Sequence, residues 1–329
     1  MAIDLGTANT VIFKDGEVVL DEPSIIALES KTERVVALGK SALAFFEPRI
    51  YRVRPMNGSI DGNDAVAKML SGFIRKAVGW DRGLLFTSLT VGIGIPCGCT
   101  PEYMRSVRDL ASHAGAKDIF MVYEPMALAL GIGLDVLDTR GNMVVDIGAG
   151  TTEIAVISKG GIIESSTIHV AGNELNTNIS DYFAQHHNVG FGYPSVEHIK
   201  LALGSALPVL PKDEDPEDEV LTGCNMVTHY PAEVTINYHE VASCLDKSVT
   251  KIESEIIKVL QRIPPELYSD IAHSGIWLAG GGSLLRGIAK RFSDKVNIPF
   301  HVAEDPLKAV ARGTCIALRG ADNFPFLMR

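Results

Sequence analysis

The chain contains one short phrase twice, and this repeat limits the possible folds more than any other feature of the sequence. Residues 2–11 read AIDLGTANTV and residues 144–153 read VVDIGAGTTE. Both copies have an Asp, an apolar residue, a Gly, two small residues and then a polar pair, at the same spacing. A chain of 329 residues is long for one hydrophobic core and fits two domains. The repeat therefore predicts two related halves with one copy in each.

The composition is that of a globular protein, with 46% hydrophobic and 21% charged residues. The formal net charge is -10, and the densest acidic stretch, KDEDPEDEV at 212–220, is typical of a solvated loop. An acidic surface repels the phosphates of nucleic acids. We therefore expect no nucleic-acid partner.

The cysteines and the apolar runs indicate the compartment. Five cysteines are too few and too oddly numbered for a disulfide framework, which favours a reducing compartment. Cys97 and Cys99 have no second pair at zinc-ligand spacing, so we interpret them as small residues near a strand end. Asp4 comes too early for a signal peptide to precede it, and no apolar run is long enough to span a bilayer. The sequence predicts a cytoplasmic protein.

Several catalytic signatures are incomplete. LGKS at 38–41 lacks the first glycine of a P-loop, and GIGLDV at 131–136 lacks the last glycine of the dinucleotide fingerprint. GGGSLLRG at 280–287 is not a nucleophile elbow. The histidines form no H-E-x-x-H pattern, and we expect them to be ordinary surface or capping residues.

Both copies of the phrase precede β-rich sequence with a hairpin signal, DG at 15–16 and KGG at 159–161. Residues 64–78 place apolar side chains on one helical face, at Val66, Met69, Leu70, Phe73, Ile74 and Ala77. A second helix has Thr100 as its N-cap and Pro101 in its first turn. Residues 89–95, 119–123, 276–282 and 298–306 read as strands beside helices. This alternation predicts an α/β protein with mixed sheets.

The repeated phrase has a chemical interpretation. A strand that ends in Asp, followed by Gly and small residues, forms a tight turn whose N–H groups can converge on an anion. The Asp can hold Mg²⁺ through water, since this ion keeps several of its waters. Two such turns, one in each half, can face each other across a cleft and bind a polyphosphate from both sides.

The sequence resembles the actin-fold ATPases, and among them the MreB family of bacterial actin homologues. Seven phrases carry the resemblance over essentially the whole chain, in matching order and spacing. They are AIDLGTANT (2–10), EPSIIAL (22–28), RPMNGSI (54–60), YEPMALALG (123–131), VVDIGAGTTEIAVIS (144–158), PPELYSDIAHSGIWLAGGGSLLRG (264–287) and DPLKAVARG (305–313).

The resemblance implies an actin-like α/β fold, with two related domains, or four subdomains, around a nucleotide cleft. It places subdomain IA at residues 1–22, 61–140 and 306–329, and IB at 23–60. Subdomain IIA would hold residues 141–178 and 236–305, and IIB residues 179–235.

The resemblance also implies the residues that hold ATP or ADP with Mg²⁺. The phosphates would contact two loops, made of Gly6, Thr7, Ala8 and Asn9 and of Gly148, Ala149, Gly150, Thr151 and Thr152. Asp4 and Asp146 would orient the Mg²⁺ hydration shell. Glu124 and Thr151 would position the attacking water, with Asp146 as the third catalytic residue. Glu124 is otherwise an ordinary first-turn acid favoured by the helix dipole.

The nucleoside end would lie against other residues of the second half. Gly280, Gly281 and Gly282 resemble the platform for adenine, and Gly172 lies in a loop that resembles the ribose-side loop. Glu197 and Lys200 match an E-x-x-K pair that flanks adenine and ribose. At this i, i+3 spacing they could also be a plain surface ion pair.

Three positions depart from the usual family pattern. Asn173 and Asn176 stand where MreB proteins usually have aspartates, and Ala202 stands where the family tends to have Glu. Losing carboxylates near the nucleotide could change affinity for ATP or the coupling of hydrolysis to filament turnover.

Membrane binding is a separate expectation. MreB proteins bind the inner face of the membrane through an N-terminal amphipathic helix, a hydrophobic loop, or both, and here the first strand begins too early for that helix. The loop VGWDRGLLF offers Trp80, Leu84, Leu85 and Phe86, with basic residues nearby to meet anionic lipid. The alternative is that residues 84–86 begin the buried strand at 89–95.

The resulting function hypothesis is an ATP-dependent filament protein that hydrolyses ATP slowly in the polymer. Its partners would be copies of itself, and possibly the inner membrane and the cell-wall synthesis machinery. Alternatives are a small-molecule kinase on the same fold, and a degenerate paralogue that binds nucleotide and co-assembles with another filament. A chaperone-type ATPase would need a peptide-binding domain after Arg329, which we do not expect.

Overall fold

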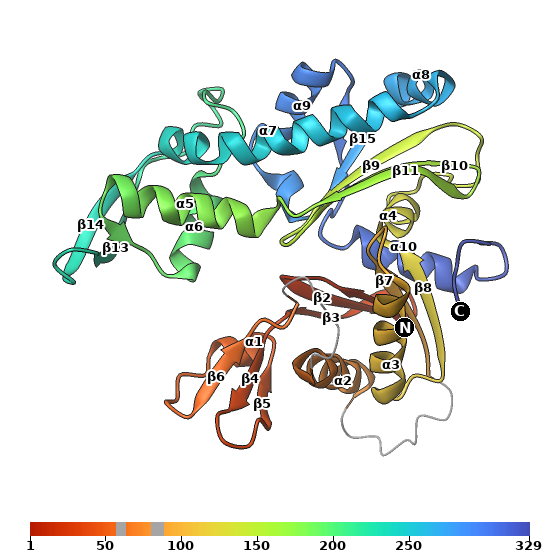
Figure 1. The fold of residues 1–329 in the computed structure, drawn as a ribbon, viewed down its shortest axis with the longest axis horizontal. Coiled ribbons are helices and arrows are strands. Elements are labelled where there is room, and N and C mark those ends of the chain that lie inside the picture. The colour runs from red at the N-terminus through yellow and green to blue at the C-terminus, as the bar shows by residue number, and fades with distance from the viewer. Residues whose placement is uncertain (57–63, 80–88) are drawn as a thin grey trace. The chain divides into compact units, whose positions relative to one another are not determined.

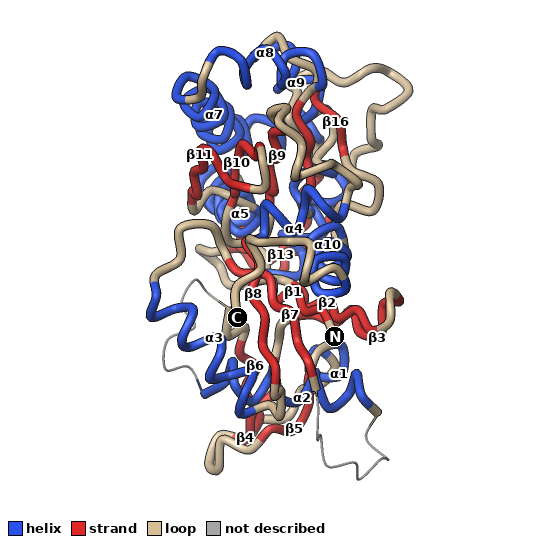
Figure 2. The backbone as a smooth tube through the Cα atoms, turned by 90° about the vertical axis from the view of Figure 1, so that its right-hand side faces the viewer, coloured by secondary structure: helices blue, strands red, loops and turns tan. Residues whose placement is uncertain are grey.

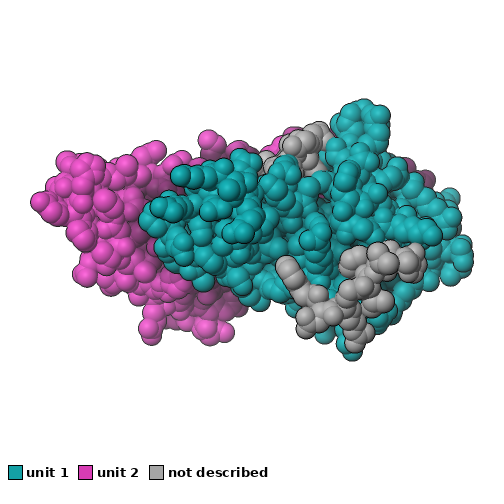
Figure 3. Space-filling view, turned by 90° about the horizontal axis from the view of Figure 1, so that it is seen from below, with its two compact units in different colours: residues 1–144, 155–165, 303–329 teal, residues 145–154, 166–302 magenta. Residues whose placement is uncertain are grey.

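Each copy of the repeated phrase lies at a turn between two strands. The computed structural model describes residues 1–56, 64–79 and 89–329. Two units make up the chain, shown in different colours in Figure 3. The first unit holds residues 1–144, 155–165 and 303–329, and the second holds residues 145–154 and 166–302.

A five-stranded mixed sheet forms the centre of the first unit, in the order β3-β2-β1-β7-β8 (Figure 1). Its strands are β1 (Ala2–Leu5), β2 (Asn9–Lys14), β3 (Glu17–Pro23), β7 (Thr90–Ile95) and β8 (Asp118–Tyr123). β1, β7 and β8 are parallel, while β2 is antiparallel to both of its neighbours. Asp15 and Gly16 join β2 to β3 with positive φ angles of 55° and 92°, as an Asp-Gly hairpin turn requires. The predicted hairpin and the two predicted buried strands are confirmed.

Helices cover this sheet because its residues alternate between two faces. Ile3 and Leu5 pack with α2 (Asp64–Val78) and α3 (Pro101–His113), whereas Ala2 packs with α10 (Ala309–Arg319). Five of the six residues predicted to form the core face of α2 are buried, and Ala77 packs against them partly buried. Thr100 caps α3 as predicted, since its Oγ1 accepts a hydrogen bond of 3.2 Å from the Tyr103 N–H.

A small sheet of order β5-β4-β6 also belongs to the first unit. It holds β4 (Ile26–Glu29), β5 (Val35–Leu38) and β6 (Ile50–Val53), and the short helix α1 (Lys40–Leu43) follows β5. Glu22, at the end of β3, connects this part to α2: its carboxylate accepts the Lys40 N–H at 2.7 Å and ion-pairs with Lys76. One buried carboxylate thus ties together three elements.

Helix α4 (Glu124–Gly131) packs against α10 with its backbone in contact. A Cβ on Gly131 would lie 1.9 Å from the Ala309 carbonyl oxygen, and one on Gly313 would lie 1.6 Å from that of Ala127. Only glycine permits this approach, because the obstructing atoms are backbone atoms. The two glycines end the phrases YEPMALALG and DPLKAVARG, so this helix crossing explains the final glycine of each phrase.

The second large sheet has the order β11-β10-β9-β15-β16 (Figures 1 and 2). It contains β9 (Asn142–Ile147), β10 (Thr152–Ser158), β11 (Gly161–Ile168), β15 (Ile276–Ala279) and β16 (Phe300–Val302). Lys159 and Gly160 join β10 to β11 with φ angles of 53° and 72°, which confirms the predicted tight turn. The strand predicted at 298–306 is real but is limited to three residues.

Several helices and a small sheet lie within the second unit. The helices are α5 (Gly172–His186), α6 (Tyr193–Leu203), α7 (Tyr238–Arg262), α8 (Pro265–Ser274) and α9 (Ile288–Val296), with a 3₁₀ turn, η1, at Gly281–Leu284. The small sheet, of order β12-β13-β14, holds β12 (Val189–Gly190), β13 (Glu219–Asn225) and β14 (Pro231–Ile236). The acidic run forms the largely exposed loop before β13, as predicted, and its Glu219 begins that strand.

No helix within residues 1–56, 64–79 and 89–329 is long and apolar enough to cross a membrane. The predicted membrane loop, with Trp80, Leu84, Leu85 and Phe86, lies outside the described residues.

The helix crossing yields a stability prediction. Gly313→Ala should lower the free energy of unfolding by about 2 kcal/mol or more, because two backbones must move apart. Urea unfolding followed by circular dichroism measures the change. Gly72→Ala on α2 is the matched control, since the atoms nearest to its new Cβ belong to the Leu38 side chain and not to backbone. Equal effects of the two variants would contradict the backbone-contact argument.

Glu22 yields a pH prediction. Burial acts to raise the pKa of its carboxyl, but the Lys40 N–H and the Lys76 ammonium outweigh burial and hold the pKa below its ordinary value of 4.5. A lowered folded-state pKa stabilises the fold above 4.5, and this stabilisation disappears as the pH falls through the folded-state value. Glu22→Gln should therefore be less stable than wild type at pH 7, with the difference shrinking in acid.

Unfolding free energies measured from pH 3 to pH 8 test this expectation. Glu17→Gln, on the same strand and exposed, is the control. A difference between wild type and Glu22→Gln that stays constant over this range would overturn it.

Candidate functional site

The loop after β9 is held in shape by the beginning of helix α5. The Gly148 N–H donates to the Thr151 carbonyl at 2.9 Å, which closes a tight turn. The carbonyl oxygens of Gly148 and Ala149 accept the N–H groups of Gly172 and Asn173 at 3.1 and 2.8 Å. Two backbone donors at the first turn of a helix, which have no acceptor within that helix, thus fix this loop.

This anchoring orients the other side of the loop. In a trans peptide the C=O and N–H groups point in opposite directions. Because the carbonyls of Gly148 and Ala149 point at α5, the N–H groups of Ala149 and Gly150 point away from it. Successive N–H groups turned to one side form an anion-binding concavity. Thr152 is buried and donates from its Oγ1 to the Val170 carbonyl at 2.6 Å, which holds the end of the loop.

Gly280, the residue after β15, lies directly against Asp146. Gly280 has a φ of 74°, and a Cβ there would lie 2.3 Å from Asp146 Oδ1. Ser283 Oγ donates to the Gly280 carbonyl at 2.7 Å and holds the turn. Gly281 and Gly282 belong to the 3₁₀ turn η1 rather than to a plain loop. The structure therefore brings the predicted adenine platform and one predicted metal-site carboxylate together.

The carboxylate of Asp146 is suited to binding a hydrated cation. Burial raises the pKa of its carboxyl to about 6. In the part of the chain that the structure describes, no side chain forms an ion pair or hydrogen bond with this carboxylate. A desolvated carboxylate without a partner favours a nearby positive charge. A hydrated Mg²⁺ fits this donor, because it binds proteins through one or two carboxylates and keeps waters.

Helices α5 and α6 bring a polar cluster together beside the loop. Lys200 Nζ donates to Glu197 Oε2 at 2.9 Å and to the Gly172 carbonyl at 3.3 Å. Asn176 Nδ2 donates to the same Glu197 Oε2 at 2.6 Å. Glu197 and Lys200 are therefore more than a surface ion pair within one helix, since they also contact α5. Gly172 is the first residue of α5, not a loop residue as expected.

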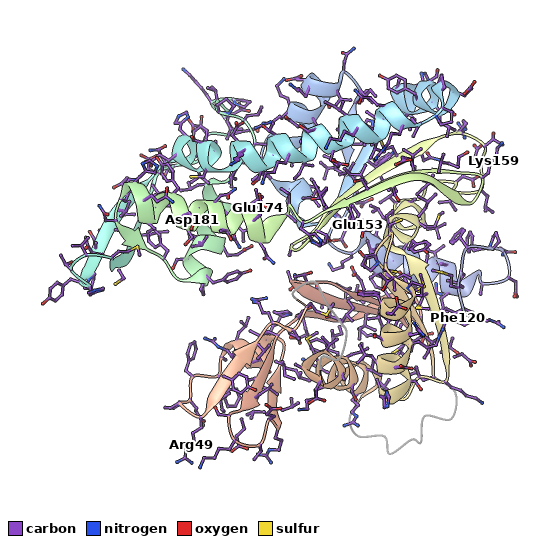
Figure 4. The ribbon with its side chains drawn as sticks, in the orientation of Figure 1. Arg49, Phe120, Glu153, Lys159, Glu174 and Asp181 are labelled. Carbon is purple, nitrogen blue, oxygen red and sulfur yellow. The ribbon has the colours of Figure 1, made fainter. Side chains whose placement is uncertain are left out.

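Helix α5 is in turn fixed on its other side to α7. Glu174, labelled in Figure 4 together with Asp181 on the same helix, accepts hydrogen bonds from Ser248 Oγ at 2.9 Å and from Lys251 Nζ at 2.7 Å. The helix that anchors the loop is thus itself anchored. Asn173 is exposed on α5 and Ala202 is half-buried near the end of α6.

The first unit holds the other predicted residues. Asp4 lies on β1, the turn from Gly6 to Asn9 follows β1, and Glu124 follows β8 as the first residue of α4. β1, β7 and β8 are parallel neighbours, so their carboxyl ends share one edge of the sheet. Two strand spacings separate β1 from β8, or about 10 Å. Ligand sites in sheets of this kind lie at this edge.

One further residue in the first unit supports the turn after β1. Ser24 Oγ donates to the Gly6 carbonyl at 2.6 Å, and its N–H donates to the Ala8 carbonyl at 2.8 Å. Thr10 Oγ1 lies 2.9 Å from the same hydroxyl. Ser24 and Thr10 are fully buried. No sequence pattern by itself gave Ser24 a role. Its position within EPSIIAL, a phrase that carries the family resemblance, was the signal that could have pointed to it.

Comparison with solved structures defines the class of protein. The fold matches MreB5 of Spiroplasma citri, solved with AMPPNP and with ADP, at a TM-score of 0.89 and 30% identity, over 98% of this chain and 96% of that one. It also matches the MamK double helical filament at a TM-score of 0.80, where 20% identity supports the fold alone. The protein has the actin-like fold, as the sequence predicted.

The family follows from sequence. The model of the MreB/Mbl protein family matches residues 1–325, and this chain belongs to that family. The cell shape-determining protein MreB of Escherichia coli K12 is 38% identical over 98% of this chain and 94% of its own length. The cell shape-determining protein Mbl of Bacillus subtilis 168 is 35% identical, with 99% and 97% covered. The chain is an MreB-type, actin-like cytoskeletal protein of the cell-shape-determining kind.

Ser24 yields a prediction for the first unit. Ser24→Ala should lower the free energy of unfolding by about 1–3 kcal/mol, because the Gly6 carbonyl loses a buried partner. Thermal and urea unfolding measure this change. Ser30→Ala is the matched control, since Ser30 Oγ also donates to a carbonyl, that of Arg49 at 2.8 Å, but at an exposed site. A Ser30→Ala variant as unstable as Ser24→Ala would refute the argument.

Proposed function

We propose that this protein binds ATP and ADP with Mg²⁺, assembles into filaments of its own copies with ATP, and hydrolyses the ATP slowly in the polymer. The observation that carries the proposal is the loop at 148–152. The N–H groups of Ala149 and Gly150 point away from α5, and Asp146, whose carboxylate has no side-chain partner among the described residues, lies near the end of the preceding strand. The AMPPNP- and ADP-bound structures of the related MreB5 support the choice of an adenine nucleotide.

The proposed roles of the residues follow the chemistry of each group. The N–H groups of the turns at 6–9 and 148–152 contact the phosphates, and Asp4 and Asp146 hold the hydration shell of Mg²⁺. When bound, Mg²⁺ would neutralise charge on the phosphates. Gly280, Gly281 and Gly282 support adenine. Gly172, Glu197 and Lys200 form the ribose side. The four subdomains given by the family resemblance are likewise part of the proposal.

In this proposal the protein catalyses hydrolysis mainly by positioning the reactants. Phosphoryl transfer requires little covalent chemistry from a protein, so the side chains act by orienting the attacking water. Glu124 has a fixed place for this task, because α4 is buried after its first residue and is clamped against α10. Gly94 on β7 leaves room for it, since a Cβ there would lie 3.3 Å from Glu124 Cγ. Thr151 would bind the same water from the other loop.

The cellular setting is also part of the proposal. The protein is cytoplasmic and lies at the inner face of the membrane, where its filaments would act as a scaffold for cell-wall synthesis. The membrane contact would come from Trp80, Leu84, Leu85 and Phe86.

Sedimentation tests the proposal directly. The purified protein is pelleted at high speed with Mg-ATP or with EDTA, and phosphate release is followed in the same tubes. Nucleotide-dependent pelleting with phosphate release is the expected result. Phosphate release from protein that stays in the supernatant would instead indicate a kinase-like enzyme. The absence of both pelleting and phosphate release would favour a degenerate paralogue. The exchanges at Asn173, Asn176 and Ala202 argue for that alternative.

Glu124 yields the sharpest prediction. Glu124→Ala should pellet with Mg-ATP but release phosphate about 100-fold more slowly, because the water loses its orienting carboxylate. Glu102→Ala is the matched control: Glu102 is also a first-turn acid, on α3. If Glu124 only complements a helix dipole, the two variants will release phosphate at the same rate.

A further inference from the structure

Asn176 is a buried polar residue that the proposed function does not use. Only 5% of its surface is exposed, and its Oδ1 is the only buried side-chain oxygen or nitrogen without a hydrogen-bond partner among the residues described. A buried acceptor without a partner is unfavourable for folding. The orientation of the amide is fixed by chemistry, because only Nδ2 can donate to the carboxylate of Glu197. Stability alone therefore does not account for an asparagine here.

The bond from Asn176 controls which oxygen of Glu197 stays available. Oε2 of Glu197 accepts Asn176 Nδ2 at 2.6 Å and Lys200 Nζ at 2.9 Å. Within the described ranges, no group donates to Oε1. The Glu197 side chain is 32% exposed, while that of Lys200 is only 14% exposed. One oxygen is thus held by two donors, and the other can still accept a hydrogen bond from outside the protein.

We propose that Asn176 is a positioning residue that holds Glu197 so that its Oε1 accepts a ribose hydroxyl, and thereby selects ribonucleotides over nucleotides lacking the hydroxyls. This inference rests on the proposed function, because it presupposes that ATP binds beside α5 and α6. It goes further by giving the nucleoside end a specificity determinant on α5. The asparagine suits this role because an aspartate at the same place would repel Glu197 unless a proton or Lys200 came between them.

The cluster also connects the nucleoside end to the phosphate loop. Lys200 donates to the Gly172 carbonyl at 3.3 Å, and the Gly172 N–H donates to the Gly148 carbonyl at 3.1 Å. Together with the 2.9 Å hydrogen bond from Lys200 to Glu197, three hydrogen bonds therefore separate Glu197 from the loop. For this reason the test separates ligands that have a ribose diol from ligands that have only phosphates.

The test measures dissociation constants by calorimetry, with Mg²⁺, for ATP, 2′,3′-dideoxy-ATP and inorganic tripolyphosphate. Wild type should prefer ATP to the dideoxy analogue. Asn176→Ala should bind ATP about tenfold more weakly, as expected for losing a hydrogen bond to a charged group, and should lose most of this preference. Its affinity for tripolyphosphate should stay within about twofold of wild type. Asn176→Leu, of similar shape, should behave in the same way without leaving a cavity.

The matched control is Asn178→Ala on the same helix. Asn178 Nδ2 donates to Ser248 Oγ at 2.7 Å, towards α7 rather than α6, so this variant loses a similar bond and should keep the preference for ATP. In a Glu197→Ala background, Asn176→Ala should have no further effect on ATP affinity, because the residue acts through Glu197. The melting temperature of Asn176→Ala should not fall below that of Asn178→Ala, since its unpartnered acceptor is also removed.

The outcomes separate the two levels of the proposal. A wild-type protein that binds no ATP would overturn both the proposed function and this inference. Wild-type binding of ATP without a preference over the dideoxy analogue would overturn only the inference. So would an Asn176→Ala variant that resembles Asn178→Ala in ligand preference, or additive effects in the Glu197→Ala background.

Discussion

The two hydrogen bonds from the first N–H groups of α5 to the carbonyls of Gly148 and Ala149 are the interaction on which the second unit's site depends. A helix start supplies donors that the helix itself cannot satisfy, and a glycine-rich turn supplies carbonyls free of side-chain obstruction. These hydrogen bonds turn the N–H groups of Ala149 and Gly150 away from α5. Glu174 at the α7 interface and Lys200 on α6 hold the same helix start from two further sides.

The first unit reaches a comparable result by different means. There a buried serine, not a helix start, holds the turn: Ser24 binds the carbonyls of Gly6 and Ala8. The second fixed point is Glu124, whose helix contacts α10 backbone to backbone through Gly131 and Gly313. Two related turns thus share a sequence phrase but have unrelated supports. Similarity of the phrase alone would not reveal this difference.

Asn176 has a different meaning in the sequence and in the fold. The resemblance to the family predicted only that it replaces a carboxylate. In the fold it is a buried donor to Glu197, and its own oxygen has no hydrogen-bond partner among the described residues. A buried oxygen without a partner lowers stability. We therefore favour a role for Asn176 in holding Glu197 over an exchange that only weakens nucleotide binding.

The sequence by itself determined the elements with strong local signals. The 3.6-residue pattern of α2, the Thr100 cap, the Asp15–Gly16 and Lys159–Gly160 turns and the duplicated strand–turn phrase depend on residues near one another in the chain. Tertiary structure alone decided which carbonyls α5 and Ser24 hold, why Gly313 cannot carry a side chain, and that Asn176 meets Glu197. Those contacts join residues far apart in sequence, and no local propensity or spacing encodes the distance between them.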